Sequence, residues 1–132
     1  MKIIADTNLL LRFFVADDPA QYQLALEVME QAESVVVPNV ALCEFAWVLR
    51  SSYGTSREKI AAAIVQLGQT GNVVMDNAAV DAGLQVLAAG ADFADGVIAY
   101  EGRWLGGETF VSFDKKAVSS VEKQGHQARL LK

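Results

Sequence analysis

Short apolar runs alternate with helical patterns along the whole chain, and this alternation limits the possible folds more than any other feature of the sequence. Strands of this kind, a few residues long and separated by helices, are typical of a parallel sheet with helices on both faces. We therefore expect an α/β protein with a doubly wound, mainly parallel sheet. The runs that predict strands are Lys2–Ala5, Ser34–Val37, Asn72–Met75, Thr109–Phe113 and Gln127–Leu131.

The segments between these runs carry helical periodicity. The first long one places Leu24 and Val28 on its apolar face. The residues from Thr55 to Glu58 have the form of a capping box, which marks the start of a helix. No repeat, linker or low-complexity segment interrupts the pattern, so we expect one domain over residues 1–132. The expected helices cover residues 20–32, 38–53, 55–68, 78–89 and 92–105, and a short helix follows Asp114.

The composition is that of a compact globular chain. Of its 132 residues, 52% are hydrophobic and 20% are charged. Cys43 is the only cysteine and allows no internal disulfide, which fits a reducing compartment. Asp6 and Arg12 interrupt the N-terminal apolar run, so it does not have the form of a signal peptide. No stretch approaches the roughly 20 apolar residues that span a bilayer. We expect a soluble, cytoplasmic protein.

The net charge of −5, from 11 basic and 16 acidic residues, is unfavourable for binding nucleic acid. Lys and Arg usually supply the contacts to phosphate. Five of the acids are candidate site residues, however, and the remaining acids equal the bases in number. If bound cations neutralise these five, the surface that meets a nucleic acid is not strongly repulsive.

Asp6 and Asp114 each follow directly after a predicted strand. Ligands bind at the carboxyl ends of the strands in open parallel sheets, so both side chains are expected at the binding edge. The alternative is that each only caps the helix after it, because Asp is a favoured N-cap residue.

Glu44 is the one charged residue in an otherwise apolar helical segment from Val40 to Leu49. A carboxylate among apolar neighbours is costly to desolvate unless a bound cation or a basic partner such as Arg50 compensates it. A buried ion pair is the structural alternative. Helical spacing places Glu44 on one face with Val40, Cys43, Trp47 and Val48.

Asp92 and Asp95 are spaced to face the same side of a helix start. The local interpretation is an N-cap at Asp92 with Asp95 favoured by the helix dipole in the first turn. Helical spacing, however, places Asp95 on the same side of the helix as Ile98 and Ala99. This indicates that the Asp95 side chain faces the interior.

A cluster of carboxylates indicates a hard divalent cation. Neighbouring carboxylates repel one another unless cations neutralise them, and oxygen ligands select Mg²⁺ or Mn²⁺ rather than zinc. A single His and a single Cys cannot build the usual zinc site. Carboxylates with magnesium suit phosphoryl chemistry, in which one ion helps to deprotonate water and one stabilises the leaving oxygen.

The ordered set of these motifs resembles the PIN domain family, and within it the VapC type of toxin. The motifs are Asp6-Thr7-Asn8 after the first strand, Glu44 in an apolar helix, the segment from Asp92 to Ala99, and Ser112-Phe113-Asp114. Each motif alone is weak, but the set spans nearly the whole chain in order. One departure is Gly96, where alanine is usual, and helix propensity makes glycine slightly unfavourable there.

The resemblance implies a metal-dependent endoribonuclease that cuts single-stranded RNA or tRNA loops, with a cognate antitoxin and dimerisation. It implies Asp6, Glu44, Asp95 and Asp114 as catalytic acids, with Asp6, Asp92 and Asp95 as ligands of Mg²⁺ or Mn²⁺. Asn8 and Ser112 correspond to small polar residues that orient the acids or a water on the metal. Candidate phosphate contacts are Arg12, Arg50, Lys115 and Lys116.

Other functions fit the residues less well. A phosphatase of the haloacid dehalogenase type needs a second Asp where Asn8 stands. A response-regulator receiver needs a central phosphoacceptor, for which Asp76 has no further support. Nucleophilic catalysis by Ser or Cys lacks a base, since His126 is the only histidine and is expected at the surface. A catalytically silent PIN-fold interaction module remains a non-enzymatic alternative.

Two apolar segments predict a partner-binding surface. The helix that contains Glu44 is apolar nearly all round, and the run from Leu9 to Phe14 is too apolar for one short helix to bury fully. We expect a hydrophobic groove beside the acids, in which a helix of an antitoxin docks. The alternative occupant of this surface is a second copy in a symmetric homodimer.

Overall fold

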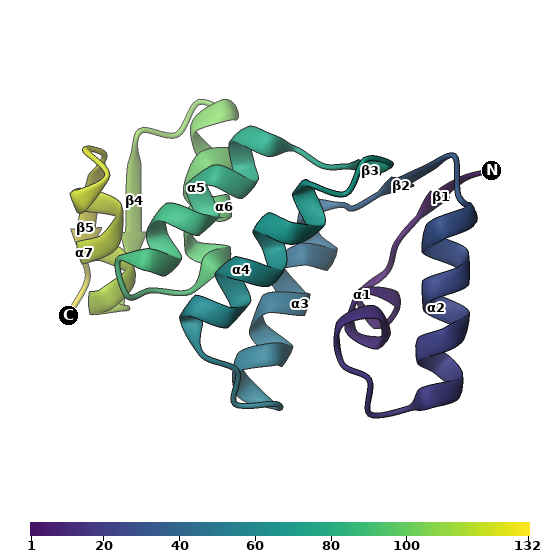
Figure 1. Ribbon diagram of the computed structural model, residues 1–132. Coiled ribbons are helices and arrows are strands. Elements are labelled where there is room, and N and C mark those ends of the chain that lie inside the picture. The colour runs from purple at the N-terminus through teal and green to yellow at the C-terminus, as the bar shows by residue number, and fades with distance from the viewer. The chain divides into compact units, whose positions relative to one another are not determined.

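The computed structural model describes residues 1–132, which divide into two compact units. Unit 1 runs from Met1 to Asp76 and unit 2 from Asn77 to Lys132 (Figure 1). Each unit combines helices with parallel strands, which confirms the predicted α/β fold class. The expectation of one domain over residues 1–132 stays a prediction. No helix is both long and apolar enough to cross a membrane.

Unit 1 contains a three-stranded parallel sheet in the order β1-β2-β3. Its strands lie close to the predicted apolar runs: β1 is Lys2–Ile4, β2 is Ser34–Val36 and β3 is Val73–Val74. The crossovers between them are helical, as parallel pairing requires. The helices are α1 (Thr7–Phe14), α2 (Pro19–Gln31), α3 (Asn39–Ser51) and α4 (Arg57–Gly68).

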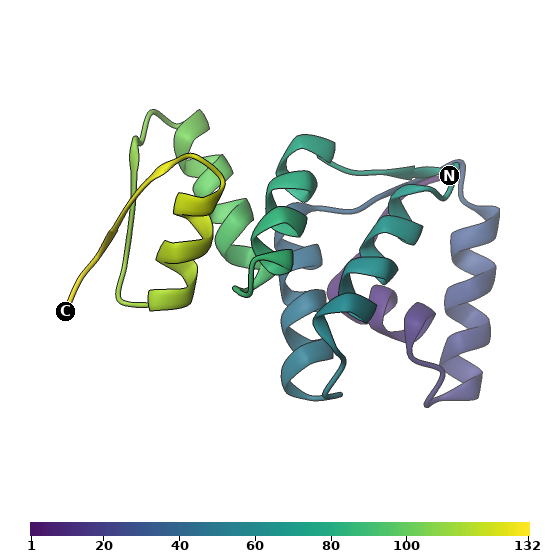
Figure 2. The same ribbon diagram turned by 60° about the vertical axis from the view of Figure 1, so that its left-hand side comes forward.

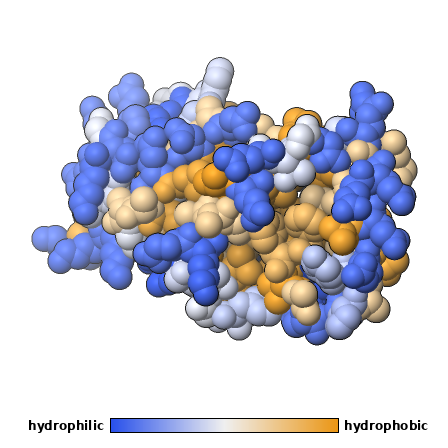
Figure 3. All heavy atoms as spheres, viewed as in Figure 1, coloured by the Kyte–Doolittle hydropathy of each residue, from blue (hydrophilic) through white to orange (hydrophobic).

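Unit 1 by itself buries only one face of this sheet. Val35, in the central strand, is fully buried. The register places Ile4 beside Val36 and Val36 beside Val74, and these three side chains are 76%, 37% and 52% exposed. Further apolar side chains reach the surface among hydrophilic ones (Figure 3). Some of the apolar side chains of the protein are therefore not buried in the core of either unit.

The predicted apolar face of α2 is wrong by one residue. Leu24 and Val28 are exposed, whereas Ala25 and Met29 are buried. Consecutive helical residues point about 100° apart, so a shift of one position exchanges the face that meets the core. The cap of α4 is also displaced by one, because Ser56 Oγ accepts the Lys59 N–H at 3.2 Å in place of Thr55.

Unit 2 contains three helices and a pair of parallel strands (Figure 2). The strands are β4 (Thr109–Ser112) and β5 (Gln127–Leu130), and α7 (Lys115–Lys123) connects them. The other two helices are α5 (Asn77–Ala88) and α6 (Phe93–Trp104). Small side chains dominate the core that these elements share, which lets them pack closely. This core comprises Val86, Ala91, Ala99, Ala117 and Val121, with Phe110 and Ala128 packed against it.

Candidate active site

Asp6 lies just beyond β1 and begins α1. Its Oδ1 accepts the backbone N–H of Leu9 at 2.9 Å, so Asp6 is the N-cap of this helix. The side chain is exposed, and the cap occupies only one carboxylate oxygen. Asn8, in the first turn of α1, is also exposed. Capping and ligation are therefore compatible at Asp6, because the second oxygen remains available.

Glu44 is exposed in unit 1, so the prediction that it is desolvated within the apolar helix is wrong there. The predicted face itself is present, because Val40 and Trp47 are likewise exposed, at 81% and 60%. α3 turns its opposite side into the core of unit 1. Leu42 and Phe45, on that side, have no exposed surface. Glu44 thus stands on an outward apolar face of α3 and has no ion pair.

Asp92 and Asp95 lie together at the start of α6. Asp92 is the N-cap residue, and its backbone N–H donates to Asp95 Oδ2 at 3.3 Å. Asp92 is exposed and Asp95 is half-buried. The inward stripe predicted for Asp95 is confirmed at Ala99, which is buried, but not at Ile98, which is 56% exposed.

Burial raises the pKa of Asp95 above its ordinary value of 3.8. The negative charges of Asp92 and Asp114 raise this pKa further, whereas the hydrogen bond from the Asp92 backbone lowers it. The influence of Asp114 shows that the folding of unit 2 brings acids from α6 and from the end of β4 within electrostatic reach. A nearby cation would relieve both the desolvation and the repulsion.

Asp114 is held by a tight turn at the end of β4. Ser112 Oγ accepts the Asp114 backbone N–H at 2.9 Å. Asp114 Oδ1 accepts the N–H groups of Lys116 and Ala117 at 2.9 and 3.1 Å and so caps α7. Ser112 therefore holds the turn through the backbone of Asp114 and not through its carboxylate. As at Asp6, the cap occupies one oxygen of the carboxylate.

The donor set of unit 2 fits a hard divalent cation. Asp92, Asp95 and Asp114 offer only carboxylate oxygens, which Mg²⁺ and Mn²⁺ prefer. Burial, followed by the charges of Asp92 and Asp114, raises the pKa of Asp95, and a cation beside this carboxylate would favour its ionised form. Neither unit alone gathers three such side chains closely enough to hold an ion. Mg²⁺ usually keeps several waters and needs few direct protein ligands, so the fit lies in the chemistry and charge of the donors.

The candidate phosphate-binding residues differ in whether their side chains already form contacts within the protein. Arg12 donates to Asp17 Oδ1 at 2.8 Å, and Tyr53 donates to the other oxygen of Asp17 at 3.3 Å. This contact ties the end of α1 to the end of α3 and competes with phosphate for Arg12. Arg50, Lys115 and Lys116 are exposed.

A polar pair that the sequence analysis did not single out as a site lies beyond β2 and β3. Asn39 Nδ2 donates to Asp76 Oδ2 at 3.4 Å. The three strands of unit 1 are parallel, so Asn39 and Asp76 share with Asp6 the carboxyl edge of this sheet. The rule that selected Asp6, a polar residue just after a strand, also points to this pair.

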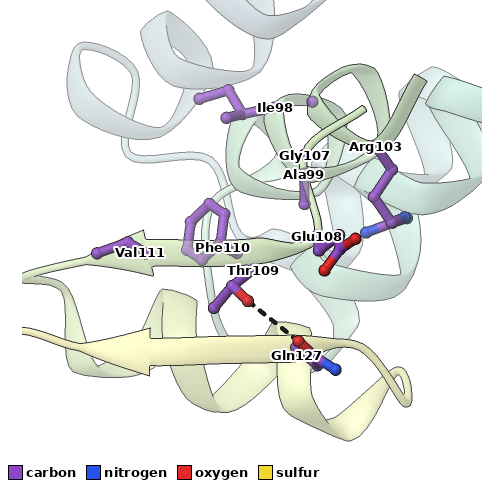
Figure 4. Close-up of a pocket in the computed structure, with 10 residues that line it drawn as sticks. Ile98, Ala99, Arg103, Gly107, Glu108, Thr109, Phe110, Val111 and Gln127 are labelled. Carbon is purple, nitrogen blue, oxygen red and sulfur yellow. Dashed lines mark hydrogen bonds between the residues drawn. The ribbon is translucent and has the colours of Figure 1, made fainter. Parts of the chain in front are cut away.

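A cavity of about 220 Å³ in unit 2 is separate from the acids. It lies between the C-terminal half of α6 and β4 (Figure 4). Thr109 at its rim donates to Gln127 Oε1 at 3.0 Å. None of the candidate site residues lines it.

Comparison with known proteins identifies one family. The family model described as "PIN domain" matches residues 3–122, which include parts of both units and every candidate site residue. No curated protein matches the chain.

Proposed function

The chain belongs to the PIN domain family, and from this membership we propose that it is an endoribonuclease that hydrolyses RNA phosphodiester bonds with Mg²⁺ or Mn²⁺. PIN domains are generally metal-dependent nucleases. The observation that carries the proposal is the family match over residues 3–122, and the geometry that supports it is the pairing of Asp92 with the half-buried Asp95 at the start of α6. The match provides no support for a haloacid-dehalogenase-like phosphatase.

The acids have distinct proposed roles. Asp6, Glu44, Asp95 and Asp114 are the catalytic carboxylates, and Asp6, Asp92 and Asp95 are the metal ligands. A bound divalent cation would supply an activated water and neutralise charge on the leaving oxygen. Asn8 and Ser112 are proposed to support the acids, and Ser112 accepts the backbone N–H of Asp114 in the turn that carries this acid.

The proposed substrate is single-stranded RNA, with phosphate contacts from basic residues near the acids. Lys115 and Lys116 directly follow Asp114 and are exposed, so both can reach a phosphate beside it. Arg50 is exposed on α3. Arg12 has to exchange its contact with Asp17 for a phosphate, which makes it a weaker candidate than the lysines.

Removal of divalent metal should abolish RNA cleavage. The purified chain is incubated with RNA and Mg²⁺ or Mn²⁺, and product formation is followed on a gel. A chelator is expected to stop cleavage, because negatively charged carboxylates repel phosphate unless a cation lies between them. Excess Mn²⁺ should restore it. Cleavage that continues in the chelator would exclude the proposed mechanism, and binding of RNA without any cleavage would favour a silent interaction module.

The chain is further proposed to be the toxin of a toxin–antitoxin pair and to form a homodimer. The support is the unusual exposure of apolar side chains on α3, where Val40 and Trp47 stand near Glu44. Phe13 and Phe14 in α1 are only half-buried, with their ring centroids 5.4 Å apart. An apolar helix of an antitoxin could dock on this surface and place a basic side chain near the acids.

Trp47→Gln should weaken inhibition by the antitoxin. The antitoxin is sought as the product of the adjacent reading frame. A large exposed aromatic is a typical anchor of an interface, and its loss is expected to raise the dissociation constant by about thirtyfold. Trp104→Gln is the matched control, since Trp104 is 76% exposed but lies in unit 2 on α6. Equal affinity of the parent and the Trp47 variant would remove α3 from the docking surface.

A further inference from the structure

We propose that Gly83 and Gly96, together with Phe93, are positioning residues that determine where Asp95 lies in unit 2. The inference rests on the proposed function, because it concerns the placement of a catalytic carboxylate. It comes from the closest approach of α5 and α6, two helices that pack against each other at the start of α6.

Gly96 lies in the first turn of α6, directly after Asp95, and its backbone packs on the backbone of α5. A Cβ atom at Gly96 would lie 2.7 Å from the Cα atom of Gly83 and would clash with the carbonyl oxygen of Ala82. Side chains of real proteins do not make such contacts, and backbone atoms cannot rotate away. Any larger residue at this position therefore has to move α6 away from α5.

Gly83 makes the second half of this contact. A Cβ atom there would lie 2.6 to 2.9 Å from three atoms of the Phe93 ring. Phe93 is only 2% exposed, so the ring fills the space that the missing side chain leaves. Phe93 is the first residue of α6 and stands between Asp92 and Asp95 in the sequence.

These contacts fix the segment that carries the acids. Asp95 is one residue before Gly96, and its carboxylate accepts the N–H of Asp92 on the other side of Phe93. Asp114 is held independently, by its own turn at the end of β4. A shift of α6 away from α5 would therefore change the position of Asp92 and Asp95 relative to Asp114. Displacement of groups that orient metal ligands typically lowers affinity or activity about 10- to 100-fold.

The test compares glycine-to-alanine variants of the full chain. Gly96→Ala is expected to weaken Mn²⁺ binding at least about tenfold and to lower kcat by a similar factor, with KM for RNA nearly unchanged. Mn²⁺ affinity is measured from the signal of free Mn²⁺ in electron paramagnetic resonance, well below the melting temperature. Gly102→Ala is the matched control, because it lies on the same helix and a Cβ atom there meets nothing within 4 Å. It should keep the parental Mn²⁺ affinity and kcat.

A rescue experiment separates positioning from general loss of stability. Gly83→Ala should weaken Mn²⁺ binding, and Phe93→Leu added to it should restore affinity, because leucine lacks two of the three clashing ring atoms, Cε1 and Cζ, and its Cδ atoms can rotate away. Phe93→Leu should not rescue Gly96→Ala, whose clash is with backbone. This pair of variants decides the question if Gly96→Ala does not fold.

Two results would overturn the inference alone. One is a folded Gly96→Ala variant with the Mn²⁺ affinity and kcat of an active parent. The other is a Gly83→Ala variant whose Mn²⁺ affinity is parental or is not restored by Phe93→Leu. A parent chain that neither binds Mn²⁺ nor cuts RNA overturns the proposed function and this inference with it.

Discussion

Asp95→Asn is expected to reduce RNA cleavage more than about a hundredfold, because even residues that only orient metal ligands typically contribute 10- to 100-fold. The substitution keeps the size of the side chain and its ability to accept the Asp92 N–H. It removes the charge on which cation binding depends. The loss should therefore appear in kcat and in Mn²⁺ affinity while the fold is kept.

The same substitution should stabilise the fold at neutral pH. Burial and the charges of Asp92 and Asp114 raise the pKa of Asp95 in the folded state, so the native protein holds this proton more tightly than the unfolded chain. Protonation of Asp95 therefore contributes to the free energy of unfolding. This contribution is fully present below the unfolded pKa of about 3.8 and is lost as the pH rises through the higher folded pKa. At neutral pH the ionised Asp95 is a net destabilising group, and asparagine lacks that charge.

Denaturant unfolding of the metal-free protein at several pH values measures this effect. The gain in unfolding free energy of Asp95→Asn over the parent should be present at pH 7 and shrink towards zero near the unfolded pKa. Asp81→Asn is the control, since Asp81 is an exposed residue of α5 outside the proposed site. If Asp95→Asn cuts RNA at the parental rate, Asp95 has no catalytic role.

Asp6→Asn is expected to abolish cleavage without destabilising unit 1, whereas Asp6→Ala should abolish cleavage and also cost about 1 kcal/mol of stability. The difference follows from the two uses of this carboxylate. Asparagine retains an oxygen that can accept the Leu9 N–H at the start of α1. Alanine loses this cap, and both substitutions remove the charge proposed to bind metal.

Asp18 provides the matched control for this pair. It caps α2 in the same way, by accepting the Gln21 N–H at 3.1 Å, and it is not a candidate acid. Asp18→Asn should leave cleavage unchanged. Cleavage rates and thermal unfolding are measured for the parent, Asp6→Asn, Asp6→Ala and Asp18→Asn. The comparison separates the capping role of Asp6 from its catalytic role. Parental cleavage by Asp6→Asn would restrict Asp6 to the role of a helix cap.

The sequence alone indicated the family and most of the elements, although the list of expected helices did not include α1 over Thr7–Phe14. Short apolar runs such as Lys2–Ala5 and Thr109–Phe113, bounded by polar residues and too short for helices, indicate strands, so the local pattern was enough to locate them. The acids that follow strands could be selected by the same reasoning, since the end of a strand is visible in the sequence. Asp92 and Asp95 could be paired because their interaction lies within one helical turn.

Tertiary structure decided the properties that depend on residues far apart in the chain. Apolar helices such as α2 and α3 offer more than one face to a core, and their neighbours chose Ala25 over Leu24 and left Glu44 exposed. The raised pKa of Asp95 depends partly on Asp114, which reaches it only through the fold of unit 2. The interpretation of Gly96 changed most between the sequence and the structure. Helix propensity makes this glycine slightly unfavourable, but the backbone of α5 lies where any side chain would have to be, and steric exclusion by packed backbone outweighs a preference of about 1 kcal/mol.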